Sequence, residues 1–229
     1  MNDLSIQITK RERTFGFCYL IAQLLILPFL IVQGNLLLGN PLSATEVNFT
    51  LFCTDFICVT VIFHRFLLHS LKHAFRSPWK LLRFAGAGLV LYWIGSYVVS
   101  IVILSVYPEF INVNDSSISE LVQDNYSLIA FGTVLLVPIT EETLYRGLIF
   151  SSIYKRSKIT AYAVSTIVFS ALHVIGYIGS YQPLHLLLCF LQYLPAGFCL
   201  AWAYVKADTI FAPILMHIAI NQTGVLAMR

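Results

Sequence analysis

The chain has 229 residues, of which 58% are hydrophobic and only 11% are charged. Its mean hydropathy is +0.80, whereas about a quarter of the residues in a typical soluble domain are charged. This composition excludes a soluble globular protein and predicts an all-α, polytopic membrane protein whose first partner is the lipid bilayer. The basic residues lie in short segments between apolar runs, without Cys/His zinc-finger spacing. Nucleic acid is therefore not an expected partner.

Seven apolar runs follow one another along the chain, and a membrane-spanning helix needs about 20 such residues. We expect spans at about residues 17–38, 47–67, 84–106, 126–154, 159–175, 184–205 and 210–227. A turn at residues 39–43, a basic loop after the second span and a polar loop over residues 107–125 connect the first four. We expect one membrane domain with two regions. Residues 1–125 form a three-helix region with an acidic outer loop, and residues 126–229 carry the chemistry.

The basic residues alternate between successive loops. If Arg65, at the end of the second span, is counted with the basic loop that follows it, all but two of the 14 Lys and Arg residues fall in the N-terminal segment or in the second, fourth and sixth loops, the exceptions being Arg146 and Arg229. Cytoplasmic loops are enriched in Lys and Arg, so the N-terminus is predicted inside and the C-terminus outside. The short loops and the lack of an obvious organelle signal favour a bacterial plasma membrane.

Three charged side chains occur together within the fourth span, namely Glu141, Glu142 and Arg146. A charge in the bilayer core is costly and by default indicates a functional site. Glu142 and Arg146 are spaced i,i+4 in the acid-first order that favours an ion pair within the helix. Glu141 lies about 100° further round the helix, so we expect it to face other partners.

Those partners are expected on two later spans, which carry His173 and the i,i+4 pair His217 and Asn221. A helical rise of about 1.5 Å per residue places Glu141, His173 and His217 about 14–22 Å from the basic ends of their spans. The pattern predicts one polar layer suited to hydrolysis. A Glu can act as a general base toward water, and imidazole and amide groups can stabilise an oxyanion or hold a metal.

Two prolines precede these polar groups, Pro138 before Glu141 and Pro213 before His217. A proline inside a helix removes a backbone hydrogen bond and can kink the helix. The freed carbonyl groups are tolerated only beside protein or water, so both prolines favour a hydrated cavity. Asp55, in the second span, is interpreted as a carboxylate that bridges helices, with a lid or supporting role beside the site as the alternative.

The residues Glu141-Glu142-x-x-x-Arg146, Phe169-x-x-x-His173 and His217-x-x-x-Asn221, in this order, resemble three motifs of a known family. This is the CAAX prenyl protease and bacteriocin-processing (CPBP, or Abi) family of intramembrane metalloproteases. The resemblance extends over about residues 134–223, and residues 1–125 resemble no family that we can name.

The resemblance implies an intramembrane endopeptidase with a polar cavity between helices. Glu141 would be the general base, and His173 would share its water or metal site. His217 and Asn221 would polarise the scissile carbonyl and hold its oxyanion, whereas Glu142 and Arg146 would be structural. Two mechanisms stay open. In one, Glu141, His173 and His217 hold a divalent metal such as zinc, and in the other the glutamate acts without metal.

The implied partner is a peptide or protein at the membrane, as in CAAX-type, bacteriocin or pheromone processing, or in self-immunity. A fold does not fix a function, so the alternative is a non-catalytic immunity or scaffold protein of the same fold. A proton- or ion-coupled transporter is a third possibility because carboxylates and imidazoles in a bundle also form relays. Paired broken segments in two halves, which would favour a transporter, are not evident.

Overall fold

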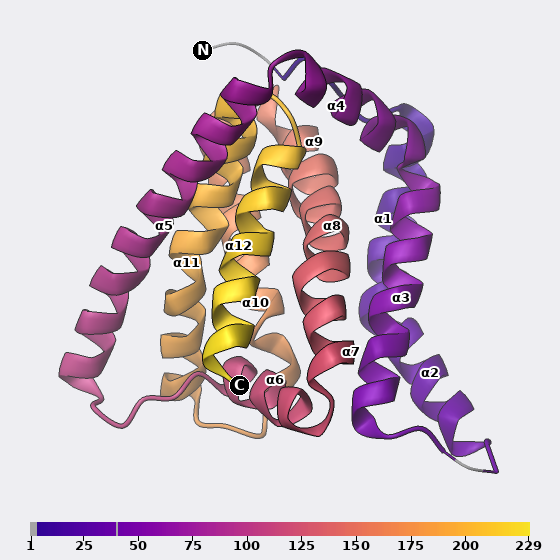
Figure 1. Ribbon diagram of the computed structural model, residues 1–229, viewed down its shortest axis with the longest axis vertical. Helices are drawn as coiled ribbons and strands as arrows, with labels where there is room; N and C mark the ends of the chain where they lie inside the picture. Colours follow the sequence, from indigo (N-terminus) through magenta and orange to yellow (C-terminus); the bar gives the residue numbers. More distant parts are fainter. Residues whose placement is uncertain (1–3, 40) are drawn as a thin grey trace.

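The computed structural model describes residues 4–39 and 41–229, and every regular element among them is helical (Figure 1). The α-helices are α1 (Lys10–Leu25), α2 (Leu27–Leu36), α3 (Ala44–Ile62), α4 (His64–Arg76), α5 (Pro78–Val106), α6 (Val113–Asp124), α7 (Tyr126–Phe131), α8 (Val137–Glu142), α9 (Ser151–Tyr154), α10 (Lys158–Leu172), α11 (Pro183–Ala207) and α12 (Phe211–Ala227). Two π-helical turns, η1 (Gly132–Leu136) and η2 (Thr143–Phe150), lie on either side of α8, and η3 (Ile175–Tyr177) is a 3-10 turn. The predicted all-α fold is confirmed.

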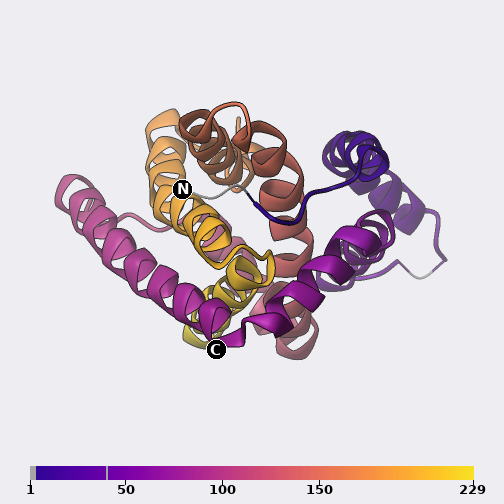
Figure 2. The ribbon, with the colours of Figure 1, turned by 90° about the horizontal axis from the view of Figure 1, so that it is seen from above.

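Five helical stretches of the described chain are long and apolar enough to cross a membrane, namely Ala44–Ile62, Pro78–Val106, Tyr126–Tyr154, Lys158–Tyr177 and Pro183–Ala207. The pair α1 and α2, bent by 45°, makes a sixth candidate. The chain is thus an integral membrane protein. All seven expected spans are helical, but the last, α12, is a shorter apolar helix of 17 residues. It lies within the bundle, packed against α5, α11 and α8 (Figures 1 and 2).

Local sequence explains where several helices begin. Thr9 with Glu12, and Ser43 with Glu46, form capping boxes that satisfy the first amides of α1 and α3. Glu12 also accepts a hydrogen bond of 2.8 Å from the backbone N–H of Phe66, which ties α1 to α4. A carboxylate that caps one helix thereby holds a second helix in place.

Two segments expected as loops are helices instead. The basic segment after α3 forms α4, and the polar segment 107–125 contains α6, whose amides are capped by Asn112. Span α5 correspondingly begins at Pro78, earlier than residue 84. Both loop interpretations were wrong because a high polar content is equally compatible with a helix lying along the membrane surface. The turn expected at residues 39–43 includes Asn40, which lies outside the described residues.

Pro138, Pro195 and Pro213 occupy different positions within their helices. Pro138 is the second residue of α8 and follows Val137, whose N–H bonds to the carbonyl of Gly132 in the π-helical turn η1. Pro213 stands in the first turn of α12, where a helix has no hydrogen bond to lose. The kink expected at Pro213 is therefore wrong. A proline inside a helix is found at Pro195 of α11, beside residues that line the cavity described below.

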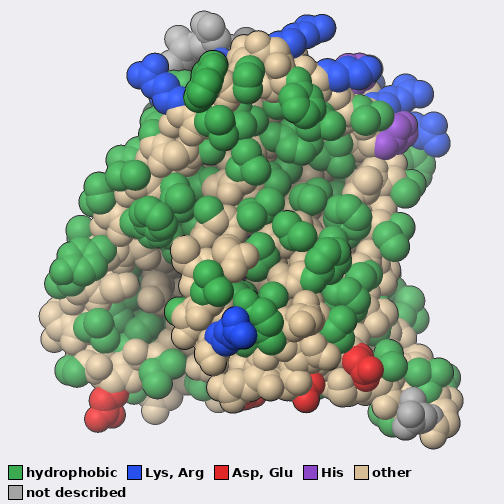
Figure 3. Space-filling model, in the orientation of Figure 1, with side chains coloured by type: hydrophobic (Ala, Val, Ile, Leu, Met, Phe, Trp, Pro, Cys, Tyr) green, Lys and Arg blue, Asp and Glu red, His purple; other side chains and the backbone are tan. Residues whose placement is uncertain are grey.

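Charge is distributed unequally between the two ends of the bundle. Figure 3 shows Lys, Arg and His side chains gathered mainly at the end formed by α4 and α9, and Asp and Glu side chains at the end where α6 lies. Between these ends the surface is largely hydrophobic, as expected for a surface in contact with lipid.

Candidate active site

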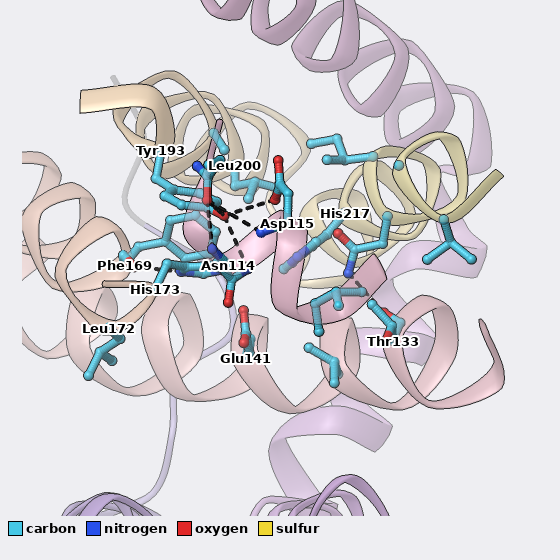
Figure 4. A pocket seen from close by; sticks show the side chains of 18 of the residues that line it. Asn114, Asp115, Thr133, Glu141, Phe169, Leu172, His173, Tyr193, Leu200 and His217 are labelled. Atoms are coloured by element: carbon cyan, nitrogen blue, oxygen red, sulfur yellow. Dashed lines mark hydrogen bonds between the residues drawn. The ribbon is translucent and has the colours of Figure 1, made fainter. Parts of the chain in front are cut away.

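A cavity of about 410 Å³ lies inside the bundle and reaches α6. Its lining includes all four residues predicted to be catalytic, Glu141, His173, His217 and Asn221. They come from three elements, α8, the end of α10 and α12, that are distant in sequence. The structure thus brings the predicted set together (Figure 4), whereas the role of each residue stays a prediction.

Glu141 points into this cavity (Figure 4). Its Oε2 atom is inaccessible to bulk solvent and has no hydrogen-bond partner among the described residues. The short helix α8 that carries it lies between two π-helical turns, and such turns are frequent at functional sites. A carboxylate oxygen without a protein partner is available to bind water.

Glu142 and Arg146 form the predicted ion pair, with 2.9 Å between Oε1 and the guanidinium. Both side chains are completely buried. Arg146 also donates a hydrogen bond of 3.0 Å to the carbonyl of Gly197 on α11 and lies 4.5 Å from the ring centre of Phe169 on α10. The pair therefore connects three helices behind the cavity.

His217 contacts a carboxylate other than the one we expected. Its Nδ1 lies 2.8 Å from Oε1 of Glu142, whereas no hydrogen bond joins it to Glu141. Glu142 thus accepts from both Arg146 and His217. When Nδ1–H donates to Glu142, Nε2 of the neutral ring carries a lone pair, and in the doubly protonated ring Nε2–H is a donor.

Asn221 donates one amide hydrogen to the carbonyl of Thr133 at 2.8 Å, which leaves its second N–H for another partner. The His173 Nδ1 lies 2.8 Å from the carbonyl of Phe169, so this nitrogen is the donor and Nε2 of the neutral ring is an acceptor. The ring of His173 also lies 4.3 Å, centre to centre, from that of Tyr193.

The sequence reasoning missed a polar group contributed by α6 and α11. The Tyr193 hydroxyl donates to Asp115 Oδ1 at 3.2 Å and accepts from the amide of Asn114 at 3.1 Å, and Asn112 donates to Gln192 at 2.7 Å. All five side chains line the cavity. The available signal was Asn112 as a helix cap ahead of an apolar-periodic segment.

The Asp115 carboxyl lines the cavity and is exposed there, although the protein around it displaces part of its hydration. This loss of hydration raises its pKa above the ordinary range, although the hydrogen bond from Tyr193 and the attraction of His173 act in the opposite direction. Asp115 lies outside the membrane-spanning helices, at the end of the bundle that carries α6.

Asp55 does bridge helices, as interpreted from the sequence. One oxygen of Asp55 accepts from the hydroxyl of Tyr19, and the other accepts from the amide of Gln23 at 3.3 Å. These contacts join α3 to α1. Asp55 also lines the cavity that contains Glu141, so the bridging carboxylate stands beside the predicted site.

The predicted metal ligands do not form a metal site in this arrangement. Within residues 4–39 and 41–229, no three His, Cys, Asp or Glu side chains are close enough together to hold an ion. Of the expected set, His217 uses Nδ1 to contact Glu142, and no contact joins Glu141 to either histidine.

Comparison with known proteins supports a protease family. Residues 123–223 match the family model of type II CAAX prenyl endopeptidase Rce1-like proteins. The chain is also 28% identical over 95 residues to UPF0177 protein YxdF of Lactococcus lactis subsp. lactis (strain IL1403). That match covers 42% of this chain and 47% of the relative, so less than half of either protein is aligned. No solved structure matches the chain.

The family match and the motifs coincide. Glu141, Arg146, His173, His217 and Asn221 all fall between residues 123 and 223, which also supply most of the cavity wall. The resemblance inferred from the motifs is therefore confirmed, in that residues 123–223 of this integral membrane protein match the Rce1-like model of type II CAAX prenyl endopeptidases.

Proposed function

We propose that the chain is an intramembrane endopeptidase that hydrolyses a peptide bond of a membrane-associated peptide or protein. One observation carries the proposal. Glu141 has an unpartnered carboxylate oxygen and shares a single cavity with His173, His217 and Asn221. A carboxylate, two imidazoles and an amide in the lining of one cavity suit general-base hydrolysis.

Glu141 is the proposed general base. It takes a proton from a water molecule, and the resulting hydroxide attacks the scissile carbonyl carbon. The tetrahedral intermediate collapses when the C–N bond breaks and Glu141 returns the proton to the leaving amine, so the carboxylate is regenerated. His173, whose Nε2 is free to accept, orients the attacking water.

His217 and Asn221 are the proposed donors to the oxyanion. His217 is held by Glu142 through Nδ1, so this contact fixes the direction of Nε2, and the doubly protonated ring donates Nε2–H to the oxyanion. Asn221 is held by the carbonyl of Thr133, which fixes the direction of its second N–H. Donors positioned in advance stabilise developing negative charge without reorganisation, and loss of one typically costs about 10²–10³-fold in rate.

The test is cleavage of peptides by the purified full-length protein in lipid nanodiscs. Glu141→Gln keeps the shape of the side chain but removes the base, and we expect a loss of about 10²–10⁴-fold in cleavage rate. Glu120→Gln, an exposed carboxylate of α6 outside the cavity, is the matched control and should cleave at the wild-type rate. Equal rates for wild type and Glu141→Gln would overturn the proposal.

Localisation and partner follow as further parts of the proposal. The bacterial origin of YxdF supports a bacterial plasma membrane, with peptide processing or self-immunity as the role. A folded Glu141→Gln protein that kept its full biological effect would favour the non-catalytic scaffold instead. Metal analysis of the active protein, with cleavage measured before and after chelation, tests whether an ion takes part.

A further inference from the structure

The cavity carries charge of one sign. Three carboxylates line it, Asp55 from α3, Asp115 from α6 and Glu141 from α8, and no Lys or Arg occurs among the described residues of its lining. Charges of one sign along a cleft with low-dielectric walls concentrate the field inside the cleft. The lining therefore discriminates between ligands by charge.

The Arg side chains near the cavity do not neutralise these carboxylates. Arg146 is buried behind the cavity and is paired with Glu142. Arg229 lies over the ring of Tyr126 and is not part of the lining. His173 and His217 do line the cavity, but His217 faces the carboxylate of Glu142 through Nδ1.

The cavity also contains polar groups that await a partner. Thr140 is only 3% exposed and lines the cavity, yet its hydroxyl makes no hydrogen bond within the described chain. The Oε2 atom of Glu141 is likewise buried and accepts no hydrogen bond from the described residues. Buried polar atoms in proteins are nearly always satisfied, so these two indicate that a polar ligand such as a peptide backbone completes the site.

The three carboxylates differ in how many of their oxygen atoms already accept hydrogen bonds. Asp55 uses both oxygens on Tyr19 and Gln23, and Glu141 is assigned to the water. Asp115 uses Oδ1 to accept from Tyr193, and no hydrogen bond to its Oδ2 is found within residues 4–39 and 41–229. Asp115 is thus the carboxylate best placed to bind a cation that enters from the α6 end.

We propose that the cavity takes a peptide segment with a Lys or Arg side chain near the cleaved bond, held by Asp115, and rejects a chain that ends there in a free carboxylate. This inference rests on the proposed function and specifies its substrate class. A terminus three residues beyond the cut lies at most about 10 Å from it, close to a cavity that the three carboxylates line. Like charges brought together in such a site are strongly disfavoured.

The first test compares matched peptides with the full-length protein in nanodiscs. A random library of N-acetylated, C-amidated peptides first identifies a cleaved sequence. Versions of it with Lys, Gln or Glu at each position near the cut are then compared, together with a version truncated to a free acid three residues after the cut. We expect kcat/KM to be at least about tenfold higher for Lys than for Glu, and at least about tenfold lower for the free acid than for its amide.

The second test assigns the selectivity to Asp115. Asp115→Asn keeps an oxygen that can accept from Tyr193 but removes the charge, and it should lower the Lys-to-Gln ratio of kcat/KM at least about fivefold. Asp124→Asn, on the same helix but outside the lining, should leave the ratio unchanged. If Asp115→Asn had the wild-type Lys-to-Gln ratio of kcat/KM, Asp115 would not be the residue that holds the cation. Equal cleavage of the truncated free-acid peptide and its amide would overturn the proposed rejection of a free carboxylate.

Binding to Glu141→Gln separates the two proposals. Fluorescence anisotropy with labelled Lys and Glu peptides measures charge preference without cleavage. If wild type cleaves no peptide of the library but Glu141→Gln still prefers the Lys peptide, the endopeptidase proposal fails and the charge preference stands. If wild type cleaves but neither protein distinguishes Lys from Glu, the charge preference fails alone.

Discussion

Two adjacent carboxylates of one helix have different environments, and the difference is one of partners. Glu142 is completely buried and accepts from both Arg146 and His217. Glu141 faces the cavity with an oxygen that has no partner in the described chain. Glu142 is therefore used in contacts within the protein, whereas Glu141 keeps an oxygen that can bind a ligand in the cavity.

Replacing each of the two carboxylates by its amide should distinguish the structural role of Glu142 from the proposed role of Glu141 in the cavity. Glu142→Gln leaves the buried guanidinium of Arg146 without a counter-ion, and breaking a buried pair in this way typically costs about 3–5 kcal/mol. Thermal unfolding in detergent should show a large loss of Tm for Glu142→Gln and little change for Glu141→Gln. Equal losses in the two variants would contradict the division.

The pH dependence of selectivity should report Asp115. Because burial raises the pKa of its carboxyl, Asp115 becomes protonated at a higher pH than an ordinary aspartate near 3.9. The preference for a Lys peptide depends on the charged form, so it is present above this raised pKa and is lost as the pH falls through it. The Lys-to-Gln ratio of kcat/KM should therefore begin to decline at a higher pH than an ordinary aspartate would cause, and the ratio of Asp115→Asn should stay flat over the same range.

Residue spacing predicted some contacts and not others. The i,i+4 pair of Glu142 and Arg146 is local, so spacing alone was sufficient. The contact of Glu142 with His217 was not predictable, because it depends on the rotation of the fourth span about its axis. The π-helical turns η1 and η2 change that rotation on both sides of α8, and sequence periodicity assumes a regular helix.

At the scale of elements, the two helices that the sequence analysis interpreted as loops, α4 and α6, are not among the candidate membrane spans. Both α4 and α6 are polar enough to be interpreted as loops, although α6 has an Asn112 cap and apolar residues that pack inward, among them Val122. Apolar length identifies spans well because the bilayer sets it. Surface helices lack this constraint, and α6 is the element that supplies Asp115 to the cavity.

Close contact between α10 and α11 should depend on Gly197. A Cβ atom at this position would lie 3.0 Å from the Cα of Thr166 and 3.1 Å from its carbonyl oxygen, and backbone yields little. We expect Gly197→Ala to destabilise the protein by about 1–3 kcal/mol, and to disturb the carbonyl that accepts from Arg146.

Gly86→Ala in α5 is the matched control for this measurement. A Cβ there meets nothing within 4 Å, and alanine is favoured over glycine in a helix by about 0.5–1 kcal/mol. Thermal unfolding should therefore show a lower Tm for Gly197→Ala and an unchanged or higher Tm for Gly86→Ala, each compared with the wild type. A Gly197→Ala protein as stable as the wild type would show that the helix pair can separate without penalty.

At the scale of the whole molecule, composition predicted the membrane bundle, and the distribution of Lys and Arg predicted a basic end. The structure shows that charge is segregated in this way (Figure 3), and it adds that the cavity reaches α6, at the opposite end from α4. If the basic end is cytoplasmic, the cavity receives its substrate from outside the cytoplasm.

Cysteine labelling in intact cells tests this orientation. Glu120 on α6 and Lys155 at the end of α9 are both exposed and lie near opposite ends of the bundle. We expect a membrane-impermeant maleimide to label Glu120→Cys in intact cells, and Lys155→Cys only after the membrane is permeabilised. The unsubstituted chain is the control, because its five cysteines lie in α1, α3 and α11, all within candidate membrane spans.

The two labelling results together decide which compartment supplies the substrate. If only Glu120→Cys is labelled in intact cells, Asp115, on the same helix, faces the outside of the cell. The cationic peptide segment would then belong to a secreted or externally added chain. The reverse pattern would place the cavity mouth in the cytoplasm and contradict the orientation inferred from Lys and Arg. Because the charge of the cavity is independent of its direction, the selectivity for Lys peptides in nanodiscs would be the same in either case.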